Sequence, residues 1–85
     1  MTYQIEFVNQ AAKQFRTLPV QIQEQPKAKI DALSTNPRPY GITKLAGEDN
    51  LYRIRSGDFC IIYTIQDRQL LILTVKIGHR RDVYR

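Results

Sequence analysis

The second half of the chain constrains the fold most, because it contains three consecutive strand-like segments separated by two short turns. Residues 51–55 alternate between apolar and basic side chains, and residues 59–65 and 70–77 are dense in β-branched and aromatic residues. Three strands joined in this way form an antiparallel meander. The predicted turns are Gly57-Asp58 and Asp67-Arg68.

The register of the first hairpin decides which side chains share a face of the sheet. A two-residue turn at 57–58, with glycine first as a type II′ turn prefers, keeps one side of the sheet apolar. Arg55 then lies opposite Cys60, and Arg53 lies opposite Ile62. A three-residue loop would place both arginines among apolar residues, so we favour the two-residue turn. Arg53, Arg55 and Cys60 are therefore predicted to share one face.

The first half of the chain predicts one strand followed by two helices. Residues 2–7 alternate apolar and polar side chains, as in a half-buried strand. Asn9 fits the N-cap position of a helix, because its short side chain can accept hydrogen bonds from first-turn amides. Ala11, Phe15 and Leu18 follow at helical spacing and predict the buried stripe of the first helix.

The second helix carries a proline on its apolar stripe. Ile22, Ile30 and Leu33 lie on this stripe, and Pro26 falls on it too. A proline inside a helix removes one backbone hydrogen bond and clashes with the preceding turn, which costs ~3 kcal/mol. The helix therefore either kinks at Pro26 or begins its regular part there, and we favour a kink. Residues 34–41 predict a loop, since they include two prolines, an asparagine and a glycine.

The order of these elements, β-α-α-β-β-β, predicts an α+β fold. We expect two N-terminal helices packed on one face of a mainly antiparallel four-stranded sheet. The 85 residues are the length of one domain, which we place at residues 1–85.

Composition narrows the classes of function. Thirteen Lys and Arg against eight Asp and Glu leave a net charge of +5, which favours a negatively charged partner. A single Cys and a single His exclude an internal disulfide and any site built from several cysteines or histidines. No apolar run approaches the ~20 residues of a membrane span, and the N-terminus lacks the pattern of a signal peptide. We therefore expect a cytoplasmic protein without a membrane partner.

The segment after the last predicted strand carries the strongest chemical signal. Residues 78–85 read Gly-His-Arg-Arg-Asp-Val-Tyr-Arg, with one imidazole, three guanidiniums and one phenol. A solvated basic tail is one interpretation. The other is a phosphate-handling site, because arginine presents a planar fork of donors to phosphate oxygens and histidine can move a proton near neutral pH. Arg53 and Arg55 would extend such a site.

Two motifs in the second half occur together. Residues 44–47 and 51–59 read Lys-Leu-Ala-Gly and Leu-Tyr-Arg-Ile-Arg-Ser-Gly-Asp-Phe, and Ile-Ile-Tyr follows at 61–63. Residues 75–84 read Val-Lys-Ile-Gly-His-Arg-Arg-Asp-Val-Tyr. Together they resemble the RelE branch of the RelE/ParE toxins, found in bacterial and archaeal toxin–antitoxin pairs. The resemblance spans nearly the whole chain and implies a compact microbial-RNase-like fold.

The resemblance also implies an activity, namely ribosome-dependent cleavage of mRNA at the A-site codon, which inhibits translation. The ribose 2′-OH attacks the adjacent phosphate and the 5′-oxygen leaves, without a metal or cofactor. Negative charge gathers on the non-bridging oxygens in the transition state, and preplaced guanidiniums stabilise that charge. Holding the 2′-OH in line supplies much of the remaining acceleration.

Site residues follow from the resemblance, position by position. Arg80 matches the transition-state arginine, and Tyr84 matches the tyrosine that stacks on or orients the scissile nucleotide. Arg53 and Arg55 match the basic pair of the central strand. His79 stands where relatives carry Lys or His, and proton transfer is the role that the resemblance suggests for it. The expected RNA contacts are Lys44, Lys76 and Arg81.

One position departs from the family pattern. Cys60 stands where many relatives have Arg, and the predicted register places it beside Arg55 on the phosphate face. A missing guanidinium there removes roughly a few kcal/mol of transition-state stabilisation, by analogy with single-donor deletions. Three outcomes follow for the nuclease activity. The chain is weak or inactive, its other cations compensate for the missing guanidinium, or the change marks an attenuated variant. We expect Cys60→Arg to raise RNA cleavage and toxicity.

Several functions stay open. The first is the mRNA endonuclease, which Gly-His-Arg-Arg-Asp-Val-Tyr favours. The others are a ParE-like inhibitor of DNA gyrase on the same fold, a non-catalytic member that only binds its antitoxin, and generic nucleic-acid binding. The family implies a RelB-like antitoxin that folds over the toxin and alone contacts operator DNA. Ribosome and mRNA are the other expected partners.

Overall fold

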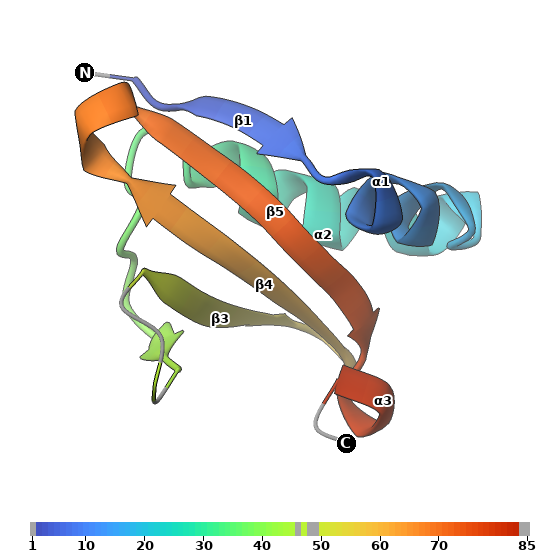
Figure 1. The fold of residues 1–85 in the computed structure, drawn as a ribbon. Helices are drawn as coiled ribbons and strands as arrows, with labels where there is room; N and C mark the ends of the chain where they lie inside the picture. Colours follow the sequence, from blue (N-terminus) through green and yellow to red (C-terminus); the bar gives the residue numbers. More distant parts are fainter. Residues whose placement is uncertain (1, 46, 48–49, 84–85) are drawn as a thin grey trace.

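A five-stranded sheet with two helices on one face forms the fold (Figure 1). The computed structural model describes residues 2–45, 47 and 50–83. The strand order is β1-β5-β4-β3-β2, with β1 parallel to β5 and the other neighbours antiparallel. The elements are β1 (Gln4–Phe7), α1 (Asn9–Arg16), α2 (Val20–Ala32), β2 (Thr43–Lys44), β3 (Leu51–Ser56), β4 (Phe59–Gln66), η1 (Asp67–Gln69), β5 (Leu71–His79) and α3 (Arg80–Val83).

The predicted α+β class is confirmed, and the sheet has one strand more than expected. The additional strand, β2, consists of two residues that pair with Arg53 and Tyr52 of β3. Two residues are too few to show an alternating pattern, so the sequence offers no signal for this strand. The last strand also extends further than predicted, to His79, and residues 80–83 form a short helix where the sequence predicted a strand-end tail.

The predicted register of the β3–β4 hairpin is confirmed. Arg55 pairs with Cys60 and Arg53 pairs with Ile62. Gly57 has a φ of +61° and Asp58 has no positive φ, as a two-residue turn with glycine in first position requires. Glycine adopts this left-handed conformation without the steric cost that a side chain would bring.

The helix starts differ from the prediction at two points. Asn9 is the first residue of α1 and not its N-cap, which is Val8 and makes no side-chain cap. Val8 stays extended because its N–H still donates to the carbonyl of Thr74 on β5. Pro19, whose ring fixes φ, precedes α2 as its N-cap.

Helix α2 runs through Pro26. The interpretation in which regular helix starts at Pro26 is wrong, because α2 begins at Val20; the kink itself stays a prediction. Ile30 and Leu33 are buried as expected, and so is Pro26. Ile22 is 38% exposed and lies outside the core, so the predicted apolar stripe continues only from Pro26 onward.

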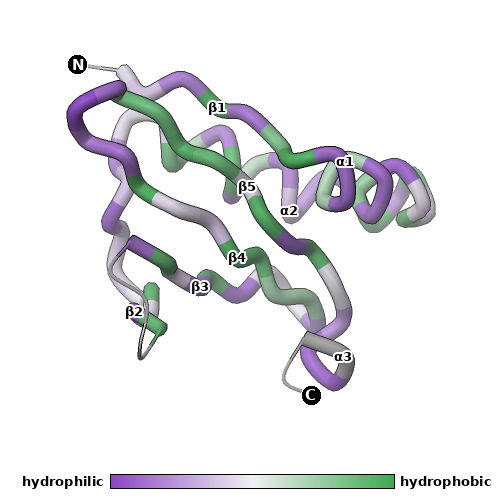
Figure 2. Tube along the Cα trace, viewed as in Figure 1, coloured by the Kyte–Doolittle hydropathy of each residue, from purple (hydrophilic) through white to green (hydrophobic). Residues whose placement is uncertain are grey.

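The core lies between the helices and one face of the sheet. Figure 2 shows apolar residues concentrated along the two central strands, β4 and β5. Side chains alternate across a strand, so every second residue of these strands points to the helices and the others point away. This leaves the opposite face of the sheet available for charged groups. The buried core residues are Ile30, Leu33, Ile54, Ile61, Tyr63, Ile65, Ile72 and Ile77.

A polar cluster ties the 34–41 loop to the η1 turn. Arg38 donates to the Asp67 carboxylate at 2.9 Å, and the Tyr3 hydroxyl donates to the same carboxylate. The Arg38 guanidinium also lies over the Tyr52 ring, 5.8 Å from its centroid. The bond from Arg38, followed by that from Tyr3, lowers the pKa of Asp67 below its ordinary value. The cluster therefore depends on an ionised Asp67.

Replacing Asp67 with asparagine should remove an acid-sensitive part of the stability. The folded-state pKa lies below the unfolded value of about 3.9, so the stabilisation is present above that pH and is lost as the pH falls through the folded-state pKa. Because the pair is exposed, the effect will be modest. Urea unfolding at pH 7 should show the variant less stable, and the two proteins should converge near pH 2. If the difference in stability between wild type and Asp67→Asn persists unchanged at low pH, the ionised Asp67 does not stabilise the fold in this way.

Candidate functional site

The face of the sheet away from α1 and α2 carries two cross-strand rows that contain the predicted basic residues. In one row Ile62 lies between Arg53 on β3 and Lys76 on β5. In the next row Cys60 lies between Arg55 and Gly78. We call this surface the basic face, defined by Arg53, Arg55 and Lys76. Adjacent strands lie about 4.8 Å apart, so the backbones of Arg53 and Lys76, two strands apart, are separated by roughly 10 Å.

The basic face is built on rigid backbone. Arg53 is half-buried, and its guanidinium donates to the Thr43 hydroxyl at 3.4 Å, which links it to β2. Arg55, two residues further along β3, is exposed. Strand positions hold side chains more precisely than loops do. The predicted pairing of these two arginines on one face is confirmed.

Cys60 is fully buried, although the register places it on the basic face. Its pairing partner on β5 is Gly78, which has no side chain. Helix α3, which follows β5, contacts both β4 and β5. The Arg80 N–H donates to the carbonyl of Asp58 at 2.8 Å, which joins the start of α3 to the β3–β4 turn (Figure 1). The thiol therefore lies inside the molecule and not on an open phosphate-binding surface.

His79 lies on the other side of the sheet from the basic face. It pairs with Phe59 across β4, and the alternation along β5 puts it on the same side as buried Ile77. The His79 and Phe59 rings meet edge to face, with centroids 5.7 Å apart and an interplanar angle of 69°. The Arg81 N–H donates to His79 Nδ1 at 3.3 Å. The expected grouping of His79 with Arg53 and Arg55 is therefore not found.

Helix α3 brings the C-terminal cations together at the end of β5. Asp58, His79, Arg80 and Arg81 line one open hollow there, and both arginines are exposed. The arrangement offers two guanidiniums on a helix that is hydrogen-bonded to the adjacent turn. Tyr84, the expected nucleotide-stacking residue, lies outside the described residues.

Lys44 is separated from this site. It pairs with Tyr52, whose side chain lies on the helix-covered side, so alternation places Lys44 on the opposite side from Arg53. Lys44 is exposed on the two-residue edge strand β2. The structure therefore does not bring Lys44 into the group formed by Arg53, Arg55 and Lys76.

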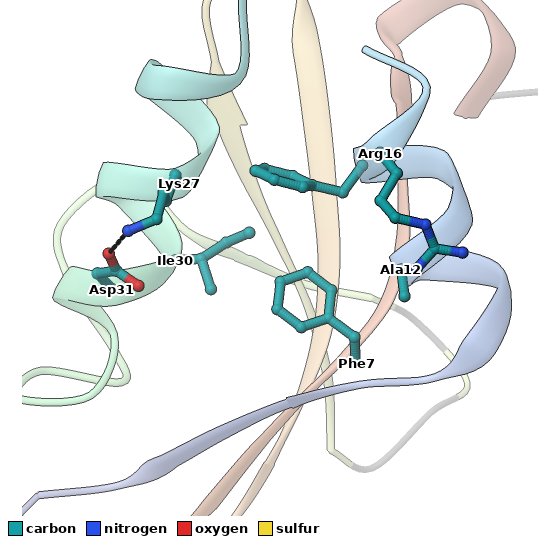
Figure 3. Close-up of a pocket in the computed structure, with 7 residues that line it drawn as sticks. Phe7, Ala12, Arg16, Lys27, Ile30 and Asp31 are labelled. Carbon is teal, nitrogen blue, oxygen red and sulfur yellow. Dashed lines mark hydrogen bonds and ion pairs between the residues drawn. The ribbon is translucent and has the colours of Figure 1, made fainter. Parts of the chain in front are cut away.

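An apolar hollow between α1, α2 and the end of β1 was not predicted (Figure 3). Phe7, Phe15 and Ile30 line it, and the ion pair between Lys27 and Asp31, at 3.0 Å, borders it. The aromatic residues were visible in the sequence as strand and helix stripes. Their meeting around one hollow depends on how α1 and α2 pack, which no local pattern encodes.

Two further properties concern the described residues as a whole. Nowhere in the described ranges do three His, Cys, Asp or Glu side chains come together as a metal ion would need. None of the helices there combines the length and the apolar character that crossing a membrane requires.

Comparison with known proteins gives matches along nearly the whole chain. Residues 5–84 match the family model described as ParE toxin of type II toxin–antitoxin system, parDE. The chain is 31% identical over 88 residues to the putative toxin RelE1 of Methanocaldococcus jannaschii, covering 100% of this chain and 98% of the relative. It is 30% identical to the mRNA interferase toxin RelE of Escherichia coli (strain K12), covering 99% and 92%.

The fold has close counterparts among solved structures. A chain of the archaeal RelE–RelB complex from Pyrococcus horikoshii superimposes with a TM-score of 0.81 and 29% identity, covering 94% of this chain and 97% of that chain. The comparisons therefore agree in family, length and fold.

Proposed function

Because the chain belongs to the ParE toxin family of type II toxin–antitoxin systems and has RelE toxins among its relatives, we propose that it is an endoribonuclease that cuts mRNA in the ribosomal A site. The observation that carries the proposal is the pair of basic groups at one end of the sheet. Arg53, Arg55 and Lys76 lie on the basic face, and Arg80 and Arg81 follow on α3.

These cations suit a reaction that concentrates charge on phosphate. As the 2′-OH attacks, the non-bridging oxygens gain negative charge, and guanidiniums held in place before the reaction stabilise that charge with little reorganisation. We assign the transition-state role to Arg80 and phosphate binding to Arg53 and Arg55. Lys76 and Arg81 bind the RNA backbone, and Tyr84 receives its stacking role from the family resemblance.

Partners follow from the same proposal. The archaeal relative of similar fold was solved as a RelE–RelB complex. We propose that a RelB-like antitoxin likewise binds this chain and silences it, and that operator DNA is contacted only through the antitoxin. Ribosome and mRNA are the targets of the released toxin, which places its action in the cytoplasm. The net charge of +5 favours association with RNA phosphate and makes it dependent on salt.

Cleavage on programmed ribosomes tests the proposal directly. The purified chain should cut mRNA at the A-site codon, leave the same mRNA intact without ribosomes, and stop cutting when its antitoxin is added. A folded, RNA-binding chain that makes no cut would overturn the nuclease function. DNA gyrase supercoiling should be assayed in parallel, because inhibition of gyrase without RNA cleavage would establish the ParE-like function instead.

Cys60→Arg probes the departure from the family pattern. The position lies in the row between Arg55 and Gly78, so a guanidinium that reaches the basic face should raise cleavage by about tenfold or more. Since Cys60 is fully buried, the larger side chain will also lower the free energy of unfolding. Cleavage must therefore be compared per folded molecule, with the folded fraction taken from urea unfolding. Equal or lower cleavage per folded molecule would refute the expectation.

A further inference from the structure

We propose that His79 is a positioning residue whose neutral imidazole caps α3 and thereby orients Arg80 and Arg81, in place of carrying a proton. The inference rests on the nuclease function proposed above. It assigns to His79 a task that the family resemblance does not give it.

The first observation is a cap at the start of α3. The leading N–H groups of a helix have no partner inside the helix. Here the Arg80 N–H donates to the Asp58 carbonyl at 2.8 Å, and the Arg81 N–H donates to His79 Nδ1 at 3.3 Å. His79 ends β5, so its backbone is extended, which is the conformation of an N-cap residue. The imidazole thus acts as a side-chain cap.

The second observation is that the imidazole is held from β4. Phe59 pairs with His79 across the strands, and the two rings meet edge to face with centroids 5.7 Å apart. A ring that is fixed in this way keeps Nδ1 aimed at the Arg81 N–H. Since Nδ1 accepts that hydrogen bond, the proton of the neutral ring sits on Nε2.

The third observation is the side of the sheet on which His79 lies. A proton carrier has to come within hydrogen-bond reach of the reacting oxygen. Strand alternation places His79 on the helix-covered side and Arg53 and Arg55 on the other. The geometry therefore separates the imidazole from Arg53 and Arg55, the residues assigned to phosphate binding. The imidazole does line the same hollow as Arg80 and Arg81, but there its Nδ1 already accepts from the Arg81 N–H.

Protonation of His79 would undo the cap. Nδ1 would then carry a hydrogen and face the Arg81 N–H, donor against donor. The new charge would also stand beside Arg80 and Arg81, and positive charge is unfavourable at a helix N-terminus. The remaining charged group lining this hollow is Asp58, and Phe59 from β4 is neutral.

Two substitutions separate the roles. His79→Asn keeps a side-chain acceptor at the cap but has no titratable group, whereas His79→Leu has neither. Each variant is assayed for A-site cleavage at pH 7.5, and the hydrogen exchange of the Arg81 amide is followed by NMR. Loss of such a cap shifts a helix equilibrium about fivefold, so the Arg81 amide should exchange about fivefold faster in His79→Leu. His79→Asn should restore protection and most of the cleavage.

The outcomes are distinct. If His79→Asn loses cleavage about a hundredfold or more, like His79→Leu, while the Arg81 amide stays protected, His79 is a proton carrier and the proposal fails. The nitrogen chemical shifts of the imidazole provide a test that needs no catalysis. A hydrogen on Nδ1 in wild type at pH 7.5 would overturn the cap even if the chain cuts RNA. Conversely, a wild type that never cuts RNA but shows Nδ1 as acceptor and a protected Arg81 amide would retain the cap and reject the nuclease function.

Discussion

Arg80→Ala is expected to lower A-site cleavage by about 10²- to 10³-fold while the chain stays folded. Removal of one preplaced donor to a developing oxyanion typically has an effect of this size. The side chain of Arg80 is exposed, so its loss leaves no cavity. Its backbone N–H still donates to the Asp58 carbonyl, so α3 keeps that attachment to the turn. The loss should therefore appear in the rate of cleavage and not in the folded fraction.

Arg68→Ala is the matched control. Arg68 is likewise an exposed arginine, but it lies in η1, which precedes β5, whereas α3 follows β5 and so occupies the opposite end of that strand (Figure 1). The two variants lose the same charge and should bind ribosomes with similar salt dependence, yet only Arg80→Ala should lose cleavage. Arg80→Lys keeps the charge without the planar fork of donors, so its cleavage rate should lie between those of wild type and Arg80→Ala. Equal losses in the Arg80 and Arg68 alanine variants would show that net charge, and not position, governs the rate.

Tyr63→Ala is expected to lower the free energy of unfolding by about 3–5 kcal/mol, the range for large aromatic truncations in a core. Tyr63 is fully buried in β4, and its ring stacks on that of Tyr52 with centroids 6.0 Å apart. Its hydroxyl donates to the Pro37 carbonyl at 3.0 Å, which attaches the 34–41 loop to the core. A chain of 85 residues has a total stability of roughly 4–13 kcal/mol, so this one change removes a large part of it.

Tyr63→Phe separates the ring from the hydroxyl. It keeps the stacked ring and deletes the bond to Pro37, so the loss should be about 1 kcal/mol. Burial raises the pKa of Tyr63 to about 12, so the hydroxyl remains a donor at ordinary pH. Its contribution is fully present below the unfolded pKa of about 10 and declines as the pH rises toward 12. Urea unfolding at pH 7 checks both variants, and a Tyr63→Phe loss as large as that of Tyr63→Ala would mean that the ring packing contributes little.

Short-range patterns in the sequence were sufficient to predict most of the helices and strands and part of the candidate site. Period-two alternation identified the strands of the meander, and Gly57, the residue that tolerates a positive φ, indicated the hairpin turn and with it the register. That register is enough to place Arg53 and Arg55 on one face of the sheet. The C-terminal motif identified Arg80 as a candidate by resemblance, which no short-range pattern would have done.

Only the tertiary structure determined the burial and the hydrogen bonds of side chains whose neighbours come from other helices and strands. The sequence determined that Cys60 shares a face with Arg55, but its complete burial emerges only in the folded structure, in which α3 packs against β4 and β5. In the same way, the sequence identified His79 as a titratable group, while its side of the sheet and its bond to the Arg81 N–H follow from the length of β5 and the start of α3. The physical reason is that alternation and turn preference act between neighbours in the chain, whereas burial and capping act between groups that only folding brings together.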